Sequence, residues 1–468
     1  MTRSRALHWF RSDLRVRDNT ALREAAARSD QLACVFVFDP RLLANAGAPR
    51  VRFMVDCVRR LAQDLEQRGQ RLLLRSGDPA TALARLVGEL RVDLVTWNRD
   101  YGPFARARDS AVERSLVAAG SRVETFKDRV VFEADEIRSR AGRPYLVYSP
   151  YRRAWWDRYL AAPVTPLAAP RLPQPSADAL TGNAPELAFD HDTTQIPTGG
   201  SAAADRRLDA FLGRAITKYA WQRDLPAVDG TSRLSPHLRF GTISVRTCFA
   251  LALEAARDDP RLAQGVAKWA DELVWREFYH AILADHPRVL RGAFRPELRS
   301  LSWEDDPSGL RAWCEGRTGY PFVDAAMREL AETGWMHNRA RMVTASFLCK
   351  DLLIDWRHGE RWFMQRLVDG DPANNNGGWQ WAASTGTDAQ PYFRIFNPVT
   401  QGERFDPDGA YVRRWLPELR RLTGARAHRP WQSPLEAQGY PAPIVDHAFA
   451  RERALARFRD ARQSAIGR

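Results

Sequence analysis

Residues 374–398 read NNNGGWQWAASTGTDAQPYFRIFNP, and this stretch carries the most unusual composition of the chain. Its first eight residues include three asparagines, two glycines and two tryptophans, Trp379 and Trp381, which stand one residue apart. Amide side chains compete with the backbone for hydrogen bonds, and adjacent glycines weaken a regular element. The mixture is atypical of a core helix or strand, so we expect it to serve a binding function.

The composition places the chain among ordinary globular proteins. Its 468 residues exceed one core and predict two or three domains, and 44% of them are hydrophobic and 27% charged. No apolar run reaches the length of a membrane span, and the N-terminus lacks the apolar core of a signal peptide. The five cysteines are scattered and never at metal-ligand spacing, which predicts reduced thiols in a cytoplasmic protein without a metal site.

The net charge of +13 predicts a polyanionic partner. All but four of the 70 basic residues are arginine. Two readings stay open here. One is codon bias in a GC-rich genome, and the other is phosphate binding, for which the forked guanidinium is well suited.

The N-terminal part alternates apolar runs with amphipathic segments. Helical periodicity covers 51–68 and 104–120, between runs that are typical of strands: 6–10, 31–39, 71–77, 93–99 and 122–132. This alternation predicts an α/β domain over 1–130, with a Rossmann-like parallel sheet and helices on both faces. No GxGxxG follows the first run, so an ordinary dinucleotide site is not supported.

A proline-rich stretch over 161–200 has little periodicity, and we expect an inter-domain linker over 131–200. Beyond it the pattern is helical, most clearly over 264–285, 322–333 and 337–354, which predicts an all-α domain over 201–468. Fourteen of the 16 tryptophans follow residue 150, so the two parts differ chemically.

Three segments of the helical part suggest binding sites. In 231–241, Thr231, Ser232 and Ser235 precede or begin a helical pattern, where hydroxyls and free N–H groups suit a phosphate or simply cap a helix. In 268–280, Trp269 and Glu272 share a helix face with Trp275 or Arg276, which suits either a pocket for a flat ligand or an amphipathic core helix.

The third segment, 334–356, places Asn338, Arg341 and Met342 on one helix face. A buried Arg341 needs an anionic partner, which Asp369 or Asp371 would supply.

Taken together, these segments resemble the photolyase/cryptochrome flavoproteins, and most closely the bacterial class I cyclobutane pyrimidine dimer photolyases. The likeness extends from HWFRSDLRVRDN to the C-terminal part, and its remaining motifs follow in the family's order: WREFY, TGYPFVDAAMREL, GWMHNRARM, DLLIDWR and NNGGWQWAASTGTDAQPYFRIFNP. It implies light-dependent splitting of dimers in UV-damaged DNA by electron transfer from reduced FAD to a flipped-out dimer.

The resemblance also implies a set of FAD-binding residues. The ribityl chain and phosphates would be held by Tyr219 and by Thr231, Ser232, Arg233, Leu234 and Ser235. The ring systems would be lined by Trp269, Asn338, Asp369 and Asp371, with Arg341 paired to Asp369 and Asn375 facing flavin N5. The amides and glycines of the opening stretch would then let the chain approach the flavin closely.

Two further groups of residues follow from the resemblance. Trp379 would be the proximal member of an electron-transfer chain that continues through Trp356 and Trp303. Trp381 would stack on the dimer, and Glu272 would hydrogen-bond its bases. The remaining substrate contacts would be Trp275 and Met342 at the bases, and Arg223 and Arg276 near the DNA.

The family's second, light-harvesting chromophore stays open. A folate antenna is not supported, because its usual contact positions hold Phe104, Ala105, Leu290 and Arg291. Arg11, Asp39 and Asp100 would suit a deazaflavin, and a chain without an antenna is the other alternative.

Three alternative functions compete with dimer repair, of which a plain flavin-binding or DNA-binding module would not need the substrate-side set Glu272, Trp275, Met342 and Trp381. A (6-4) photolyase would carry histidines where this chain has Asn338 and Met342, and a signalling cryptochrome usually has a C-terminal extension. We expect a monomer in the cytoplasm, without an obligate protein partner and without membrane attachment.

Overall fold

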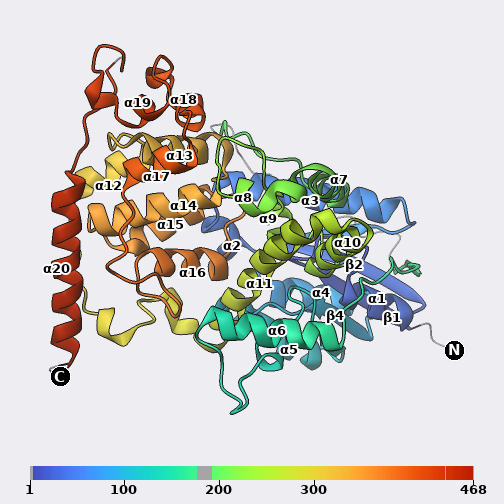
Figure 1. Cartoon of the computed structure of the whole chain (residues 1–468). Helices are drawn as coiled ribbons and strands as arrows, with labels where there is room; N and C mark the ends of the chain where they lie inside the picture. The colour runs from blue at the N-terminus through green and yellow to red at the C-terminus, as the bar shows by residue number, and fades with distance from the viewer. Residues whose placement is uncertain (1–3, 177–191, 438, 467–468) are drawn as a thin grey trace. The chain divides into compact units, whose positions relative to one another are not determined.

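The computed structural model describes residues 4–176, 192–437 and 439–466. They form two compact units, each of which is described by itself (Figure 1). The first unit comprises Met1–Asp192, Ile196–Thr217 and Ser232–Pro287. The second comprises Thr193–Gln195, Lys218–Thr231 and Arg288–Arg468.

A parallel sheet forms the centre of the first unit. Its strands run in the order β3-β2-β1-β4-β5, and the short β6 pairs with β2. The strands are β1 (Arg5–Phe10), β2 (Gln31–Phe38), β3 (Leu72–Ser76), β4 (Leu94–Asn98), β5 (Arg122–Phe126) and β6 (Gln174–Pro175). All five predicted strands are therefore confirmed, although the last one ends at Phe126 and not at residue 132.

Alternate residues of the strands face opposite sides of the sheet, as the pleat requires. In β2, Cys34 and Phe36 belong to one buried cluster, whereas Ala33 and Val35 belong to the other. The first cluster includes side chains of α1 (Thr20–Ala27) and α3 (Ala48–Glu66), and the second those of α4 (Pro79–Leu90) and α5 (Pro103–Ala118). Helices thus cover both faces of the sheet, as predicted.

A buried network of ion pairs joins distant segments of the first unit. Asp128, which follows β5, accepts hydrogen bonds at 2.6 Å from Arg15 and from Arg246 of α10 (Val245–Asp258). Asp18 pairs with Arg246 at 3.1 Å and also accepts a bond from Ser244. All four charged groups are at most 5% exposed, so each charge depends on its partners in the network.

The compact units depart from the domain borders predicted at 130 and 200, and the ion pairs of Arg246 are one contact that joins a segment beyond residue 200 to the α/β part. Residues 201–217 and 232–287 belong to the first unit, and they contribute α7 (Ser201–Ala210), α9 (Ser235–Phe240), α10 and α11 (Ala263–Asp285). The predicted linker also contains α6 (Tyr148–Ala161) and β6, while its residues 177–191 lie outside the described part of the chain.

Helices make up the second unit. They are α8 (Tyr219–Gln222), α12 (Pro307–Cys314), α13 (Pro321–Thr333), α14 (Asn338–Ser346), α15 (Trp356–Arg366), α16 (Pro372–Ala382), α17 (Pro398–Phe405), α18 (Ala410–Trp415), α19 (Ala425–His428) and α20 (His447–Ile466). The long C-terminal α20, red in Figure 1, buries a stripe with helical spacing. The stripe consists of Ala450, Ala454, Phe458 and Ala461. All of these residues except Ala450 belong to one hydrophobic cluster with Leu298, Leu301 and Leu353.

The predicted helix over 337–354 is shorter than expected. It runs as α14 to Ser346, widens into a π-helical turn over Phe347–Asp351, and ends where Leu353 adopts a positive φ of 57°. Lys350 in this turn is fully buried and donates to Ser384 Oγ at 2.8 Å. Burial lowers the pKa of Lys350 to about 7.

Among the described residues, no helix has the length and apolar character needed to cross a membrane.

Candidate functional site

Residues 374–382, the first part of the stretch 374–398, lie in the helix α16 (Pro372–Ala382), although their composition is atypical of a regular element. Asp371 caps this helix by accepting hydrogen bonds at 3.0 Å from the N–H groups of Ala373 and Asn374, and Pro372 occupies the first turn. The amides of Asn376 and Gln380 do not compete with the backbone of α16, because they bond groups outside this helix. Gln380 Nε2 donates to Val289 O at 2.9 Å, and its Oε1 accepts from Phe294 N at 2.8 Å.

Asn375 and Asn376 attach α16 to α15. Asn375 Nδ2 donates to the backbone oxygen of Glu360 at 3.0 Å, and Asn376 Nδ2 donates to its carboxylate at 2.9 Å. Burial raises the pKa of Glu360 to about 7, although the bond from Asn376 acts in the opposite direction. Asn375, Asn376 and Gln380 thus all bond other parts of the chain, and the approach of these amides to a ligand stays a prediction.

The two tryptophans of α16 have different surroundings. Trp379 is 2% exposed, and its ring meets Phe363 at 5.0 Å and Trp313 at 5.9 Å, nearly edge-on in both contacts. Trp381 is only partly buried and lies 6.5 Å from the ring of Phe396. The separation of roles that the sequence predicts for this pair is consistent with their burial.

The other two tryptophans of the predicted electron-transfer chain lie in the same hydrophobic cluster as Trp379. Trp356 is 2% exposed at the start of α15, and the partly buried Trp303 meets Phe458 of α20 at 6.2 Å. Trp313, which the sequence analysis did not single out, is fully buried in contact with Trp379. Trp313 stands alone in a short helix, so no pattern in the sequence indicated that it would contact Trp379.

Arg341 and Asp369 form the predicted ion pair, with 2.8 Å between Arg341 Nη2 and Asp369 Oδ2. Asp369 is 7% exposed, and its Oδ1 has no hydrogen-bond partner among the described residues. The Nε1 of Trp379 is also buried without a partner there. Unsatisfied buried polar atoms usually mark a place for a ligand or an ordered water.

The remaining predicted residues of the second unit are more exposed. Asn338 is exposed and its Nδ2 lies 3.7 Å from Met342 Sδ, so these two predicted neighbours are in contact. The guanidinium of Arg223 lies 5.7 Å from the ring centre of the buried Tyr219. Thr231 is half-buried at the end of this segment.

In the first unit the predicted anion-binding segment precedes the short helix α9. Leu234 is buried, whereas Arg233, with a positive φ of 48°, and Ser235 are exposed. Ser232 Oγ lies 3.3 Å from the indole nitrogen of Trp269, which is 3% exposed on α11. The structure thus brings two of the predicted cofactor residues into contact.

The helix α11 also carries the predicted substrate residues of this unit. Glu272 and Trp275 are half-buried, and Arg276 donates to the backbone oxygen of Arg129 at 2.9 Å. The ring of Trp275 lies parallel to that of Tyr148, with 3.6 Å between ring centres and 10° between planes. Tyr148 belongs to α6, in the segment predicted as linker, and was therefore missed.

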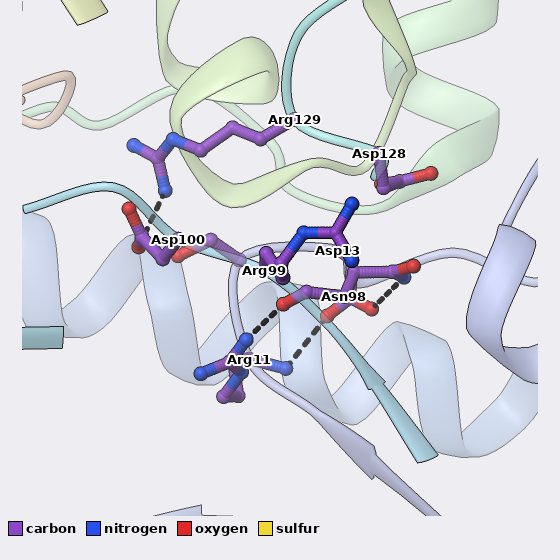
Figure 2. Close-up of a pocket in the computed structure, with 8 residues that line it drawn as sticks. Arg11, Asp13, Asn98, Arg99, Asp100, Asp128 and Arg129 are labelled. Carbon is purple, nitrogen blue, oxygen red and sulfur yellow. Dashed lines mark hydrogen bonds and ion pairs between the residues drawn. The ribbon is translucent and has the colours of Figure 1, made fainter. Parts of the chain in front are cut away.

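A small polar cavity lies at the carboxyl ends of β1 and β4, where the strand order reverses (Figure 2). Open parallel sheets bind ligands at this point. The cavity has a volume of about 10 Å³, which is on the order of one water molecule. Its lining residues are Arg11, Ser12, Asp13, Asn98, Arg99, Asp100, Asp128 and Arg129.

The charges around this cavity are paired. Arg11 bonds Asp109 at 2.6 Å, and Asp100 pairs with Arg129 at 3.0 Å. Burial favours the neutral form of Asp100, but the nearby guanidiniums, Arg129 first, hold its pKa well below the usual range. Asp39, the third residue predicted for a deazaflavin, instead caps α2 (Pro40–Ala44) and bonds the Arg41 side chain.

At the predicted folate positions the side chains are apolar or solvent-exposed. Phe104 is 42% exposed, Ala105 is buried in α5, Leu290 is half-buried and Arg291 is exposed.

Comparison with known proteins identifies the family. Residues 6–174 match the family model described as DNA photolyase, and residues 269–460 match the FAD binding domain of DNA photolyase. The chain belongs to the DNA photolyase family. The sequence-based assignment to this family, its fold and its FAD-binding domain is thereby confirmed.

The curated relatives of this photolyase-family chain match along nearly their whole length. It is 45% identical to the deoxyribodipyrimidine photo-lyase of Halobacterium salinarum, over 97% of this chain and 99% of the relative. It is 43% identical to the Escherichia coli enzyme of the same name, over 98% and 99%. Among solved structures, a class III photolyase from Agrobacterium tumefaciens superimposes with a TM-score of 0.90 at 37% identity, covering 99% of this chain and 98% of that one.

Proposed function

We propose that this chain is a light-driven DNA repair enzyme that splits cyclobutane pyrimidine dimers in UV-damaged DNA. The observation that carries the proposal is its near full-length identity of 45% and 43% to two deoxyribodipyrimidine photo-lyases. The net charge of +13 supports a polyanionic substrate.

The residues of the second unit fit a bound flavin. Asp369 Oδ1 and Trp379 Nε1 are buried hydrogen-bonding atoms without a partner among the described residues, and the Arg341 guanidinium fixes the other oxygen of Asp369. Asn375 would present its amide to the flavin ring, and Asp371 would line the same binding site. When FAD is bound in its reduced form, it supplies the electron that splits the dimer.

The remaining predicted cofactor residues would hold the FAD phosphates and adenosine. We assign this role to Tyr219, Thr231, Ser232, Arg233, Leu234, Ser235, Trp269 and Asn338. The contact between Trp269 and Ser232 supports it, because the indole N–H orients the hydroxyl that would meet the ligand.

Recognition of the dimer falls to side chains with partial exposure. Trp275, Trp381 and Met342 would pack against the flipped-out bases, and each is only partly buried in the free chain. Glu272 would accept hydrogen bonds from the bases. Arg223 and Arg276 would contribute positive charge toward the DNA backbone.

We assign Trp379 as the indole that gives up an electron when the enzyme is activated by light, with Trp356 and Trp303 continuing the path. Their association with one hydrophobic cluster supports a shared path. Trp313 lies in ring contact with Trp379, at 5.9 Å between ring centres, and offers an alternative second indole for the path.

The cavity at the carboxyl ends of β1 and β4 has a volume of about 10 Å³, and the Arg11 and Asp100 side chains that line it are held in ion pairs with Asp109 and Arg129. We therefore assign no function to an antenna at this cavity.

Repair of a defined oligonucleotide tests the proposal. The FAD-loaded, chemically reduced protein should restore a thymine dimer to two thymines under near-ultraviolet or blue light and leave it unchanged in the dark. A matched oligonucleotide with a (6-4) photoproduct should stay unrepaired, because Asn338 and Met342 stand where that chemistry needs histidines.

Chromatography of the digested DNA distinguishes the outcomes. Repair of the (6-4) product would favour that alternative function, and loss of neither lesion from FAD-loaded protein would favour a photoreceptor. The cytoplasmic, monomeric state expected from the sequence stays a prediction, which ultracentrifugation of the purified protein would test.

A further inference from the structure

The inference concerns Tyr148 and rests on the proposed role of Trp275 in contacting the dimer. The two rings stack in parallel, with 3.6 Å between their centres and 10° between their planes. The other described neighbours of Trp275 meet it differently: Phe278 nearly edge-on at 81° and Tyr279 at a tilt of 37°. Among the described residues, Tyr148 is thus the parallel partner of this indole.

The position of Tyr148 is itself fixed by hydrogen bonding. Its hydroxyl donates to the backbone oxygen of Asp271 at 2.8 Å, and only 7% of the residue is exposed. Asp271 and Trp275 stand four residues apart on α11, so they lie one above the other on the same helix face. The tyrosine therefore touches this face at two successive turns, once through its hydroxyl and once through its ring.

Further contacts hold the two helices together along the same line. Arg152, one turn beyond Tyr148 on α6, donates to Asp271 Oδ1 at 2.6 Å. The indole nitrogen of Trp156, one turn further, lies 3.3 Å from the same oxygen. This row of α6 residues makes the backing of Trp275 a rigid part of the first unit.

We propose that Tyr148 is a positioning residue for dimer recognition. An indole has two faces, and a ring fixed against one face sets the plane in which the other face meets a flat ligand. Preorganisation of this kind lowers the entropy that binding would otherwise cost. Tyr148 acts through Trp275 and does not itself touch the substrate.

Substitutions at Tyr148 in the FAD-loaded enzyme test the proposal. Tyr148→Leu removes the stacking ring and should raise the half-saturating concentration of dimer-containing DNA roughly two- to tenfold. The repair rate at saturation and the affinity for undamaged DNA of the same sequence should not change. Tyr148→Phe keeps the ring and should stay within about twofold of the parent, because the stack survives.

Tyr151→Leu is the matched control. Tyr151 is also buried on α6 and packs on Phe278 at 5.2 Å, but its described ring contacts do not include Trp275. This variant should bind dimers like the parent. Flavin content and circular dichroism of every variant verify that the fold is intact.

A double-mutant cycle with Trp275→Ala decides whether Tyr148 acts through the indole. In the Trp275→Ala background, Tyr148→Leu should cause no further loss of dimer affinity. An equal loss in both backgrounds, an equal loss with Tyr151→Leu, or no loss in the parent background would overturn the inference. If Trp275→Ala alone binds dimers like the parent, then Trp275 does not contact the dimer and the inference about Tyr148 is wrong as well. If the parent protein repairs no dimers, the proposed function itself is wrong.

Discussion

Replacing Gly359 by alanine should destabilise the protein, although alanine is the better helix former. Gly359 lies in α15, and a Cβ at this position would stand 2.0 Å from Cη2 and 2.5 Å from Cζ3 of Trp379. Leu348 Cδ2 would be 2.7 Å away on another side. Real Cβ contacts are essentially never shorter than 3.0 Å, so the indole or the helix must move by about 1 Å.

Two opposing effects set the magnitude. Alanine in a helix interior is about 1 kcal/mol more favourable than glycine. Overpacking of a well-packed core costs about 1–3 kcal/mol. Trp379 is 2% exposed between Phe363 and Trp313, so it cannot yield into open space, and the upper end of that cost applies. We expect a net loss of about 1–2 kcal/mol in the free energy of unfolding.

Gly378→Ala is the matched control for Gly359→Ala. Gly378 lies on the exposed side of α16, and a Cβ there would meet nothing within 4 Å. This variant should gain about 0.5–1 kcal/mol from helix propensity alone. Urea unfolding followed by circular dichroism compares the two. If Gly359→Ala is as stable as Gly378→Ala, the contact with Trp379 does not constrain α15 and the reasoning is wrong.

Four further predictions address electron transfer, stability, pH and DNA binding. Trp379→Phe should abolish photoreduction of the flavin but leave repair by chemically reduced enzyme intact. Trp381→Ala should leave photoreduction intact and weaken dimer binding by about 1–3 kcal/mol. A variant that keeps both activities would contradict the role assigned to its tryptophan. Asp128→Ala leaves the buried Arg15 guanidinium without its counter-charge and Arg246 with Asp18 alone, and it should cost about 3–5 kcal/mol in urea unfolding, while a loss below about 1 kcal/mol would show that water reaches the network. Because burial lowers the pKa of Lys350 from 10.5 to about 7, the unfolded state binds the extra proton above pH 7. Stability should therefore rise between pH 7 and 8.5, and this rise should shrink in Lys350→Met. Dimer-DNA affinity should fall with salt at a log–log slope of about −0.9 per phosphate contact, and a flat dependence would exclude the basic surface as the binding face.

The strands were predictable because each is a short apolar run between amphipathic segments. In β2, Ala33, Cys34, Val35 and Phe36 are all apolar, and such a run is typical of a parallel strand that is covered on both faces. The helix α6 was not predictable in the same way. Its buried residues, Tyr148, Tyr151, Trp155 and Tyr159, lie beside a proline-rich segment, which favoured a linker.

Within the candidate site, pairings between opposite charges were easier to foresee than aromatic contacts. The need of a buried guanidinium for an anion limited the partner of Arg341 to Asp369 or Asp371, and the family resemblance selected Asp369, which the structure pairs with it. The contacts of Trp313 and Tyr148 depend on which helices lie side by side, and no local sequence pattern indicates which helices are neighbours. The structural role of Gln380 in α16 was not predicted for a related reason. Its hydrogen-bond partners in 289–294 lie more than 80 residues away in the sequence.

The buried ion pairs of the first unit limit how the chain can be divided. A fragment that ends at the proline-rich segment would retain Asp18 and Asp128 but lose Arg246, which closes the network from a point more than 110 residues further along. During synthesis Arg15 can pair with Asp128 early, but Asp18 stays without its guanidinium partner until α10 has left the ribosome. An excision of the α/β part for protein engineering should therefore carry 232–287 along, or replace Asp18 with a neutral residue of similar size and keep the Arg15–Asp128 pair.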